Sequence, residues 1–557
     1  MIFRTILLCA LFVASFFTVE AKRVSKAQQR DSITIFGRVL CNGNPVANVP
    51  VSDGVHIVKT DSLGRYAIAS YKFQNTVFVI TPSGYEPVCR KRILPTFWAE
   101  LRKKREVAEE HNFYLQKRNQ QNHRIIFMSN LFLQNSNDDL LQFKKKTIPA
   151  ARILSNEAVA DSTAVYTILL GDISNCPNWY SREFDVGDAV SLIASLRYPT
   201  MLYTVMGDQD NDGAVPGTGL TDYKAERQYV YTCGPKYYSM NIGDIHYIVL
   251  DNTVFRNEPG KGKYPPEIAG RRNYDRFVTL DQLAWLRRDL ALIKDKSTPI
   301  VVCMHHTAFT ANSKNRISKR FSKPEHLDSL TKCFTEYQNV HFVTSGSMDR
   351  RISRPKELPN IVEHAIASTS GDRWKTGYNG YRQINGAGTP AGFEVFDIKG
   401  RKMEWYHADE SGSTKPFRVY DMTKVGEYYR ENLDVQNLIR EYSRTVLNYG
   451  APEFAQYIYI NWWGNERGAK LEVFEDNKPL RVRQIHHTDP LFVVTSTTFT
   501  LKHSRNKPRI GRNNSNHLFR VQRTSQNSTI RVRSTSPFGV VHEEIIVGNK
   551  PFSQQAN

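Results

Sequence analysis

The chain has 557 residues, too many for one hydrophobic core, so we expect roughly three or four domains. A hydrophobic content of 40% with 11% aromatic residues fits folded globular domains and excludes a largely disordered chain. The formal net charge of +20 favours an anionic partner, such as a phosphorylated small molecule, a lipid or a glycan. The same charge would also serve simply to keep the protein in solution, so the class of partner stays open.

The first 21 residues have the pattern of a secretory signal peptide. Arg4 gives a positive start, a short apolar segment follows, and Val19 and Ala21 occupy the small-residue positions before a cut at Lys22. The apolar segment is short for a transmembrane helix, and no later stretch of the sequence is long and apolar enough to be one. We therefore expect an exported protein; an uncleaved membrane anchor is the alternative.

Residues 33–117 have the pattern of a small N-terminal β-sandwich. Alternating segments such as "ITIFGRVL" and "NTVFVITPSGY" are separated by turn sequences such as "CNGNP". Cys41 and Cys89 both fall in this region. A disulfide between them would suit an exported protein, although the sequence does not establish one.

Residues 121–410 contain apolar, strand-like runs with longer spacers, among them "RIIFMS", "AVYTILLGD", "TMLYTVMGD", "HYIVLDN", "PIVVCMHH" and "VHFVTSG". Between two of these runs, residues 279–296 predict a helix with an apolar stripe at Leu283, Leu286 and Leu290. Strands that alternate with helices predict an α/β domain. A hairpin at residues 242–244 would make its sheet mixed rather than parallel.

Residues 416–550 alternate again and predict a C-terminal β-sandwich, with strands expected at "QYIYINWW", "LFVVTST" and "STIRVRS". Between residues 501 and 542 there are many basic residues and no acidic one. The anion-binding candidates in this part are Arg509, Arg520, Arg531 and Arg533. The alternative is a solvated sheet edge that cations protect from aggregation. The sequence has no repeat and no nucleic-acid-binding signature, which argues against DNA or RNA as the partner.

Polar side chains follow the ends of successive strands in the α/β region. In chain order they are Asn130, Asp172, Asp208, Gln209, Asp210, His305, His306 and Asp349. Ligands of open α/β sheets bind beyond the carboxyl ends of the strands, so we expect these side chains to meet at one site. Each type also has a structural interpretation, namely a turn carboxylate, a buried histidine or a salt-bridge partner. "GDRW" at residues 371–374 would line a pocket or, as is more typical, form a packed turn.

The motifs "LLGD", "VMGDQD", "CMHH" and "SGSMD" occur in the order and at the spacing of the calcineurin-like metallophosphoesterases, which this chain resembles. Its domain order, and stretches such as "INGAGTPAGFEVFDIKGRKMEWYH", resemble exported bacterial members of that family. The resemblance implies a central α/β (α+β) mixed β-sheet sandwich, flanked by N- and C-terminal all-β sandwiches. It also implies two bound metals, hydrolysis of phosphoric esters and a periplasmic, outer-surface or secreted location.

Several family metal ligands are replaced in this chain. One metal position corresponds to Asn130, Phe132, Asp172 and Asp349; the other corresponds to Asp172, Asp208, His305 and Ser347. Phenylalanine cannot bind a metal, and an asparagine oxygen is a weaker ligand than a carboxylate. The resemblance therefore implies at most one divalent cation, of the hard type Mg²⁺, Mn²⁺ or Ca²⁺.

Gln209 stands where the family has its catalytic histidine. Glutamine cannot donate a proton as an acid, and loss of a general acid costs about 10²–10⁴-fold in rate. We therefore expect an exported phosphoesterase homologue that is impaired or non-catalytic and binds an anionic, phosphorylated ligand. The alternative is an active metal-dependent phosphomonoesterase or phosphodiesterase. A purely structural surface protein is a third interpretation.

Overall fold

The structure is a computed structural model. It describes residues 32–91, 93–260, 266–311, 317–346, 349–376, 383–504, 507–508, 510, 513–546 and 551–552. The expected signal peptide, Ser347 and Arg509 lie outside these residues. Among the helices described, none has the length and apolarity needed to cross a membrane. The six cysteines that follow the expected cleavage point, Cys41 and Cys89 included, are free thiols.

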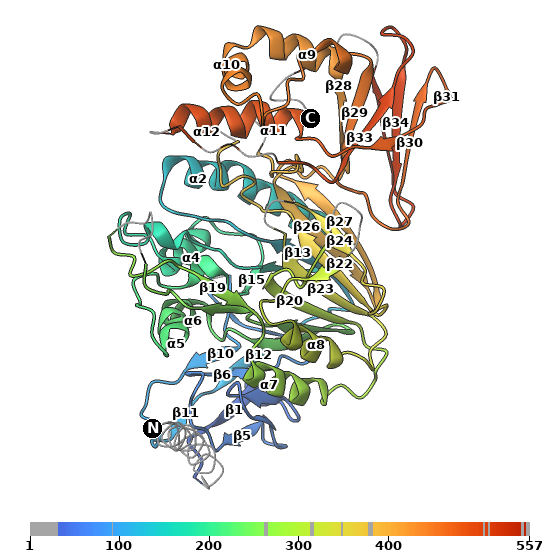
Figure 1. Ribbon diagram of the computed structural model, residues 1–557. Coiled ribbons are helices and arrows are strands. Elements are labelled where there is room, and N and C mark those ends of the chain that lie inside the picture. Colours follow the sequence, from blue (N-terminus) through green and yellow to red (C-terminus); the bar gives the residue numbers. More distant parts are fainter. Residues whose placement is uncertain are drawn as a thin grey trace, which may run out of the picture.

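The N-terminal part is built from short strands around a small apolar core (Figure 1, blue). The strands are β1 (Ile35–Cys41), β2 (Asn44–Pro45), β3 (Pro50–Ser52), β4 (Ile57–Lys59), β5 (Arg65–Ile68), β6 (Thr76–Val79), β7 (Tyr85–Pro87), β8 (Cys89–Arg90), β9 (Leu94–Pro95), β10 (Trp98–Glu100), β11 (Glu109–Glu110) and β12 (Phe113–Lys117). One sheet has the order β11-β1-β12-β7, and the other has the order β10-β6-β3-β4. Two packed sheets are the sandwich that the alternating sequence predicts.

The central part consists of two mixed sheets. The first has the order β15-β14-β13-β26-β27, with β13 (Asn122–Met128), β14 (Ala164–Leu169), β15 (Met201–Thr204), β26 (Gly392–Lys399) and β27 (Lys402–Asp409). The second has the order β16-β17-β20-β23-β25-β24, with β16 (Tyr238–Ile242), β17 (Ile245–Val249), β20 (Ile300–His306), β23 (Val340–Ser345), β24 (Arg351–Ser353) and β25 (Ile361–Ile366). The strands β16 and β17 form the hairpin expected at residues 242–244.

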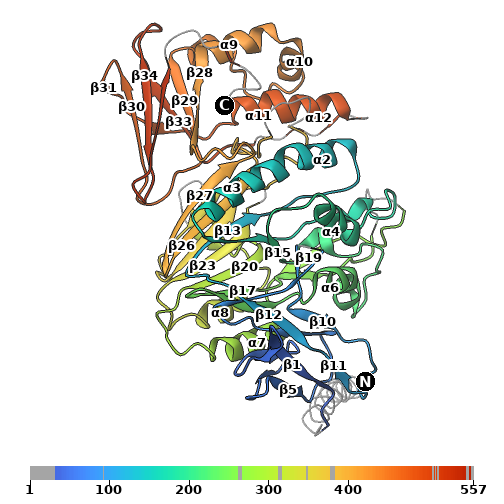
Figure 2. The same cartoon turned by 180° about the vertical axis from the view of Figure 1, so that it is seen from behind.

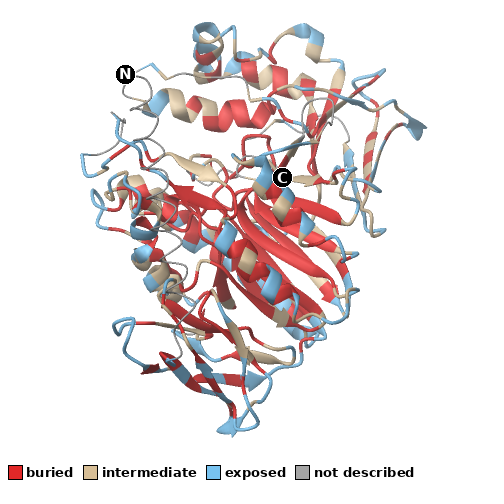
Figure 3. Cartoon of the chain, turned by 60° about the horizontal axis from the view of Figure 1, so that its bottom comes forward, coloured by how far each residue is buried: buried red, intermediate tan, exposed pale blue. Residues whose placement is uncertain are grey.

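One apolar core lies between these two sheets and includes side chains from both, such as Phe127 and Tyr247. The strands of this core are almost continuously buried (Figure 3). Helices and short ribbons surround the sheets: α2 (Asn137–Gln142), α3 (Ile148–Ala160), α4 (Val186–Ser195), α5 (Thr221–Ala225), α6 (Arg227–Cys233), α7 (Leu280–Leu290), α8 (Pro324–Lys332), β18 (Thr253–Phe255), β19 (Tyr274–Arg276), β21 (Phe309–Ala311) and β22 (Ile317–Lys319). Helix α7 is the helix expected from the apolar stripe, and Leu283, Leu286 and Leu290 are buried. The mixed sandwich confirms the predicted fold class.

The C-terminal part has two four-stranded sheets and a layer of helices (Figures 1 and 2, orange and red). Its elements are β28 (Phe417–Asp421), α9 (Met422–Glu431), α10 (Leu433–Glu441), β29 (Tyr457–Trp462), β30 (Lys470–Glu475), β31 (Lys478–Pro479), β32 (Arg483–Gln484), α11 (Pro490–Phe492), α12 (Thr498–His503), β33 (Leu518–Gln522), β34 (Ile530–Thr535) and β35 (Val541–Ile546). The helices pack on one sheet through their own apolar cluster. The sandwich is therefore present, with helices that the sequence analysis did not include.

The expected strand at "LFVVTST" is wrong, because this segment is helical from Pro490 to His503. Asp489 begins the helix by accepting hydrogen bonds from the amides of Leu491 and Phe492 at 2.9 and 3.1 Å. Proline at the first helical position suits this start, since its missing N–H needs no partner there. The apolar run is long enough for a strand or a helix, and the capping contacts of Asp489 favour the helix.

Candidate metal and anion site

The loops after β14 and β15 approach each other closely at the carboxyl end of the first central sheet. A Cβ on Gly207 would lie 2.4 Å from the amide nitrogen of Asp172, and one on Gly171 would lie 2.7 Å from Nδ1 of His305. Glycine is therefore required at both positions. Asp172 has a left-handed backbone, with φ of 54°, which turns its side chain back over the strand ends.

Asp210 holds these two loops together. Its carboxylate accepts hydrogen bonds from the backbone amides of Asp172, Ile173 and Gly207, each at 2.9 Å. Burial raises the pKa of Asp210 to about 6, although the three amides favour its charged form. Asp210 is thus a turn carboxylate that positions Asp172.

His305 faces two carboxylates. Its Nδ1 lies 2.6 Å from the carbonyl oxygen of Leu170, to which it donates. Its Nε2 lies 3.3 Å from Oδ1 of Asp208 and 3.5 Å from Oδ1 of Asp172. A histidine whose Nδ1–H is fixed by a carbonyl presents Nε2 to a metal in the usual way.

The charges at this point are unbalanced without a cation. Burial and the neighbouring Asp208 raise the pKa of Asp172 to about 8. Burial also disfavours charge on His305, but the two carboxylates raise its pKa to about 10. Carboxylates this close repel one another when both are ionised. A divalent cation that displaces the proton from His305 would satisfy all three groups.

His306 completes a group that the sequence analysis did not assemble. One ligand atom each from Asp208, His305 and His306 lie within 4.8 Å of one another. Consecutive strand residues normally point to opposite faces, but a register shift between Met304 and His306 interrupts β20 here. Nothing in the sequence signals this irregularity. Burial holds the pKa of His306 well below its usual value, so its imidazole is neutral.

The donor set fits one cation. Nε2 of His306 is buried and lacks a hydrogen-bond partner among the described residues, as a ligand nitrogen without its metal would. The His306 ring stacks on the Tyr274 ring, with centroids 4.9 Å apart and an angle of 12° between the planes. Asp208 and His305, both predicted ligands, are therefore brought together with His306, and Asp172 lies beside them.

At the family metal position that corresponds to Asn130 and Phe132, both side chains contact other protein groups. Asn130 donates from Nδ2 to Oδ2 of Asp172 at 3.1 Å, and its oxygen accepts from the Ser345 hydroxyl. The guanidinium of Arg373 lies 4.6 Å from the centre of the Phe132 ring. The side chain of Asn130 is thus committed to protein partners, and Phe132 offers no ligand atom.

Gln209 is buried and fixed at both ends of its amide. Its Nε2 donates to Oδ2 of Asp208 at 2.6 Å, and its Oε1 accepts from Nη2 of Arg272 at 3.1 Å. It therefore orients Asp208 and has no proton to give as an acid.

Asp349 binds elsewhere. Its carboxylate pairs with Nε2 of His517 from the C-terminal part, so a ligand role for it remains a prediction. The C-terminal arginines also have partners: Arg520 lies 4.5 Å from the Tyr457 ring, Arg531 lies 4.7 Å from the Phe474 ring, and Arg533 pairs with Glu543 at 2.9 Å. Anion binding by these arginines also remains a prediction.

The metal group opens into a cavity of about 410 Å³ that is lined by four arginines. They are Arg276, Arg320, Arg351 and Arg373. The sequence analysis assigned them no anion-binding role, because they come from separate loops and short ribbons with no common motif. Four guanidinium groups beside the group of Asp208, His305 and His306 make this cavity a candidate site for an anionic ligand.

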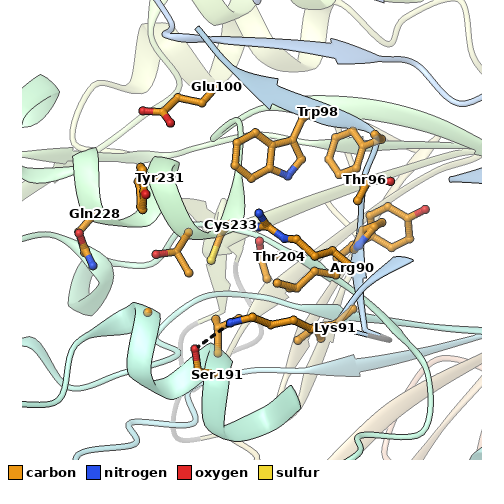
Figure 4. A pocket seen from close by; sticks show the side chains of 18 of the residues that line it. Arg90, Lys91, Thr96, Trp98, Glu100, Ser191, Thr204, Gln228, Tyr231 and Cys233 are labelled. Carbon is orange, nitrogen blue, oxygen red and sulfur yellow. Dashed lines mark hydrogen bonds between the residues drawn. The ribbon is translucent and has the colours of Figure 1, made fainter. Parts of the chain in front are cut away.

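A larger cavity, of about 610 Å³, lies between the N-terminal part and helices α4 and α6 (Figure 4). Arg90 extends across it, Lys91 donates to Ser191 at 3.4 Å, and Trp98 covers one side. One of the carboxylates that line this cavity, Asp185, caps helix α4. No metal-type group of histidine and carboxylate was found here among the described residues. The larger of these two cavities is therefore not the one that contains the candidate metal group.

The two-sheet sandwich and the carboxylate–histidine group at its strand ends define a metallophosphoesterase-type fold and site. Residues 33–118 match the family model "N terminal of Calcineurin-like phosphoesterase", and residues 363–542 match "C terminal of Calcineurin-like phosphoesterase". The chain belongs to the calcineurin-like phosphoesterase family. Among curated proteins, none matches it.

Solved structures with some similarity include a dimetal phosphatase from Danio rerio, at 11% identity and a TM-score of 0.31, over 52% of this chain and 96% of that chain. Another is the sulfate thiohydrolase SoxB from Thermus thermophilus, at 9% identity and a TM-score of 0.29, over 64% and 76%. A third is the 5'-nucleotidase from Candida albicans SC5314, at 8% identity and a TM-score of 0.27, over 52% and 51%.

Proposed function

We propose that this protein is an exported phosphoesterase homologue that binds one divalent cation and a phosphorylated small molecule, with hydrolysis impaired. The observation that carries the proposal is the group of Asp208, His305 and His306 inside a cavity lined by arginines. A cation bound there would supply positive charge for a phosphate oxygen. Export is supported by the N-terminal sequence pattern, and cell fractionation tests it.

The residues around the group act by orientation and charge. The Leu170 carbonyl directs Nε2 of His305 toward Asp208, and Gln209 holds the outer oxygen of Asp208. Two imidazole nitrogens with carboxylate oxygens suit Mn²⁺ better than Mg²⁺ or Ca²⁺, which prefer oxygen ligands alone. We therefore propose Mn²⁺ as the first cation to test.

Impaired hydrolysis would follow from three substitutions. Phe132 and the committed Asn130 do not support a second cation, so only one would act on a bound phosphate. Gln209 occupies the position of the acid and is held by Arg272. Loss of the acid alone would lower the rate by about 10²–10⁴-fold.

An active hydrolase is the second candidate function, and family membership favours it. Metal analysis of the mature protein, with turnover of p-nitrophenyl phosphate and bis(p-nitrophenyl) phosphate, separates the two. We expect one equivalent of metal, lost in Asp208→Asn and kept in Asp349→Asn, with turnover near background. Two equivalents with rapid turnover would establish the hydrolase, and a metal-free protein would refute a cation site.

A further inference from the structure

Three of the cavity arginines come from three separate segments and line the same wall. Arg276 ends β19, Arg320 follows β22, and Arg351 begins β24. The three arginines lie in or directly after short strands, so this charge is a feature of the fold rather than of one basic stretch of sequence.

Hydrogen bonds tie these segments to one another. The amide of Arg276 donates to the Ser322 hydroxyl at 3.0 Å, and the amide of Ser322 donates back to the Arg276 carbonyl at 2.8 Å. The amide of Arg320 donates to the carbonyl of Ala308 at 2.8 Å. Nη2 of Arg351 donates to the carbonyl of Phe309 at 3.2 Å. The segment after β20 thus connects the arginine cluster to the histidines of the metal group.

The three guanidinium groups lack an acidic partner of their own. Within the described residues, none of the three forms an ion pair with a carboxylate. The buried acid whose charge acts on Arg320 and Arg351 is Glu363, but its oxygens accept from the amides of Ala308 and Phe309 at 2.6 and 3.1 Å. Partial burial, followed by the charges of Arg276 and Arg351, lowers the pKa of Arg320. Like charges that gather without counter-charges are stabilised by a bound anion.

One aromatic ring, Tyr274, contacts both the metal group and the arginine cluster. The Tyr274 ring stacks on His306 at 4.9 Å, and the guanidinium of Arg276 lies 5.6 Å from the centre of the same ring. Arg373, the fourth arginine of the cavity, lies over the Phe132 ring. One phosphate at the metal group would leave the three-arginine cluster free for another anion.

We propose that Arg276, Arg320 and Arg351 bind a second phosphate of the same ligand, so that the ligand is a bisphosphorylated small molecule. This inference rests on the proposed function, in which the metal group binds the first phosphate. Arginine binds phosphate through paired N–H donors, which gives affinity and sets the orientation of the ligand. The two phosphates would then lie on either side of Tyr274.

The test uses calorimetry on the full mature chain loaded with Mn²⁺, with fructose 1,6-bisphosphate and fructose 6-phosphate as matched probes. We expect the bisphosphate to bind at least about tenfold more tightly, as one added charge-assisted contact provides. Arg320→Gln should remove most of this preference, and Arg320→Lys should keep part of it. Arg401→Gln, at an exposed position between β26 and β27, should keep all of it.

Equal affinity for the two probes, or an equal loss for both in Arg320→Gln, would overturn the two-phosphate inference. Metal content and melting temperature are measured on every variant, so a folding defect is recognised. A metal-bound protein without bisphosphate preference refutes this inference alone. A metal-free protein that keeps the preference refutes the proposed cation site alone, and a protein that binds neither probe refutes both.

Discussion

Arg350 forms a buried ion pair that connects the central sheets to the C-terminal part. Its Nε and Nη2 donate to the two oxygens of Glu394 at 2.8 and 2.6 Å, and its Nη1 donates to the carbonyl of Trp463 at 2.9 Å. The two side chains are 4% and 1% exposed. Replacement of Arg350 by methionine would keep the volume and leave Glu394 buried without its partner.

The expected loss follows from this geometry. Removal of one member of a buried, hydrogen-bonded ion pair costs about 3–5 kcal/mol, because the other charge stays out of water. In a unit the size of the central sheets, each kcal/mol lowers the melting temperature by about 2–4 °C, so Arg350→Met should lower it by about 6–20 °C. Arg350 also precedes Arg351, so the same change should weaken anion binding in the cavity.

A double-mutant cycle measured by urea unfolding checks the reasoning. Arg350→Met/Glu394→Met should recover part of the stability lost by Arg350→Met, since Glu394 is then no longer buried without its partner. The loss that remains comes from Glu466, whose buried carboxylate lies 3.8 Å from Nη2 of Arg350. The control is Arg401→Met, which breaks the pair with Asp295 at 2.7 Å between side chains that are 44% and 54% exposed. Water screens these charges, so the control should cost far less stability than Arg350→Met. A single-variant loss as small as the control, or additive losses in the cycle, would refute the argument.

Three further outcomes are expected. Mn²⁺ at about 100 times its dissociation constant should stabilise the protein against thermal unfolding by about 2.7 kcal/mol. Asp208→Asn should abolish this gain in stability, and Asp349→Asn should keep it. Gln209→His should raise p-nitrophenyl phosphate turnover by about 10² or more if the missing acid limits the reaction; no gain would place the limit at Phe132. Burial lowers the pKa of His123 to about 4, so the folded state keeps this ring neutral while the unfolded state takes up a proton below about pH 6.5. Stability should therefore fall by up to about 1.4 kcal/mol per pH unit from pH 6.5 to 4, and urea midpoints at pH 7.5 and 5.5 should differ less in His123→Gln.

The two central sheets follow from the sequence because their strands are long, apolar and bounded by tight turns. The hairpin at residues 242–244 and helix α7 were predicted from local pattern alone, and both are present. The strand prediction for the segment at Leu491 was wrong because the apolar residues of this segment suit a strand or a helix equally. Asp489 and Pro490 favour the helix through a capping contact that hydrophobic periodicity does not describe.

The candidate site could be predicted only where strand ends determine it. Asp172 and Asp208 follow buried strands and His305 lies at the end of one, so sheet topology brings them together. His306 required a register shift in β20, and the arginine cluster required contacts among segments far apart in the sequence. Anion binding by the basic C-terminal stretch stays a prediction; one of its arginines, Arg533, pairs with Glu543 on the neighbouring strand.

The substitutions in "GDQD" change the balance between binding and turnover at one site. Asp208 places a second carboxylate beside His305, which would strengthen the attraction for the proposed cation. Gln209 fixes that carboxylate but offers no acidic proton to a leaving group. In the proposed function, the arginines around the cavity would add affinity for phosphate without supplying that proton. A site with strong attraction for ligand and no proton donor holds a phosphate ester longer than it cleaves one, and that physical argument favours a binding role for this family member.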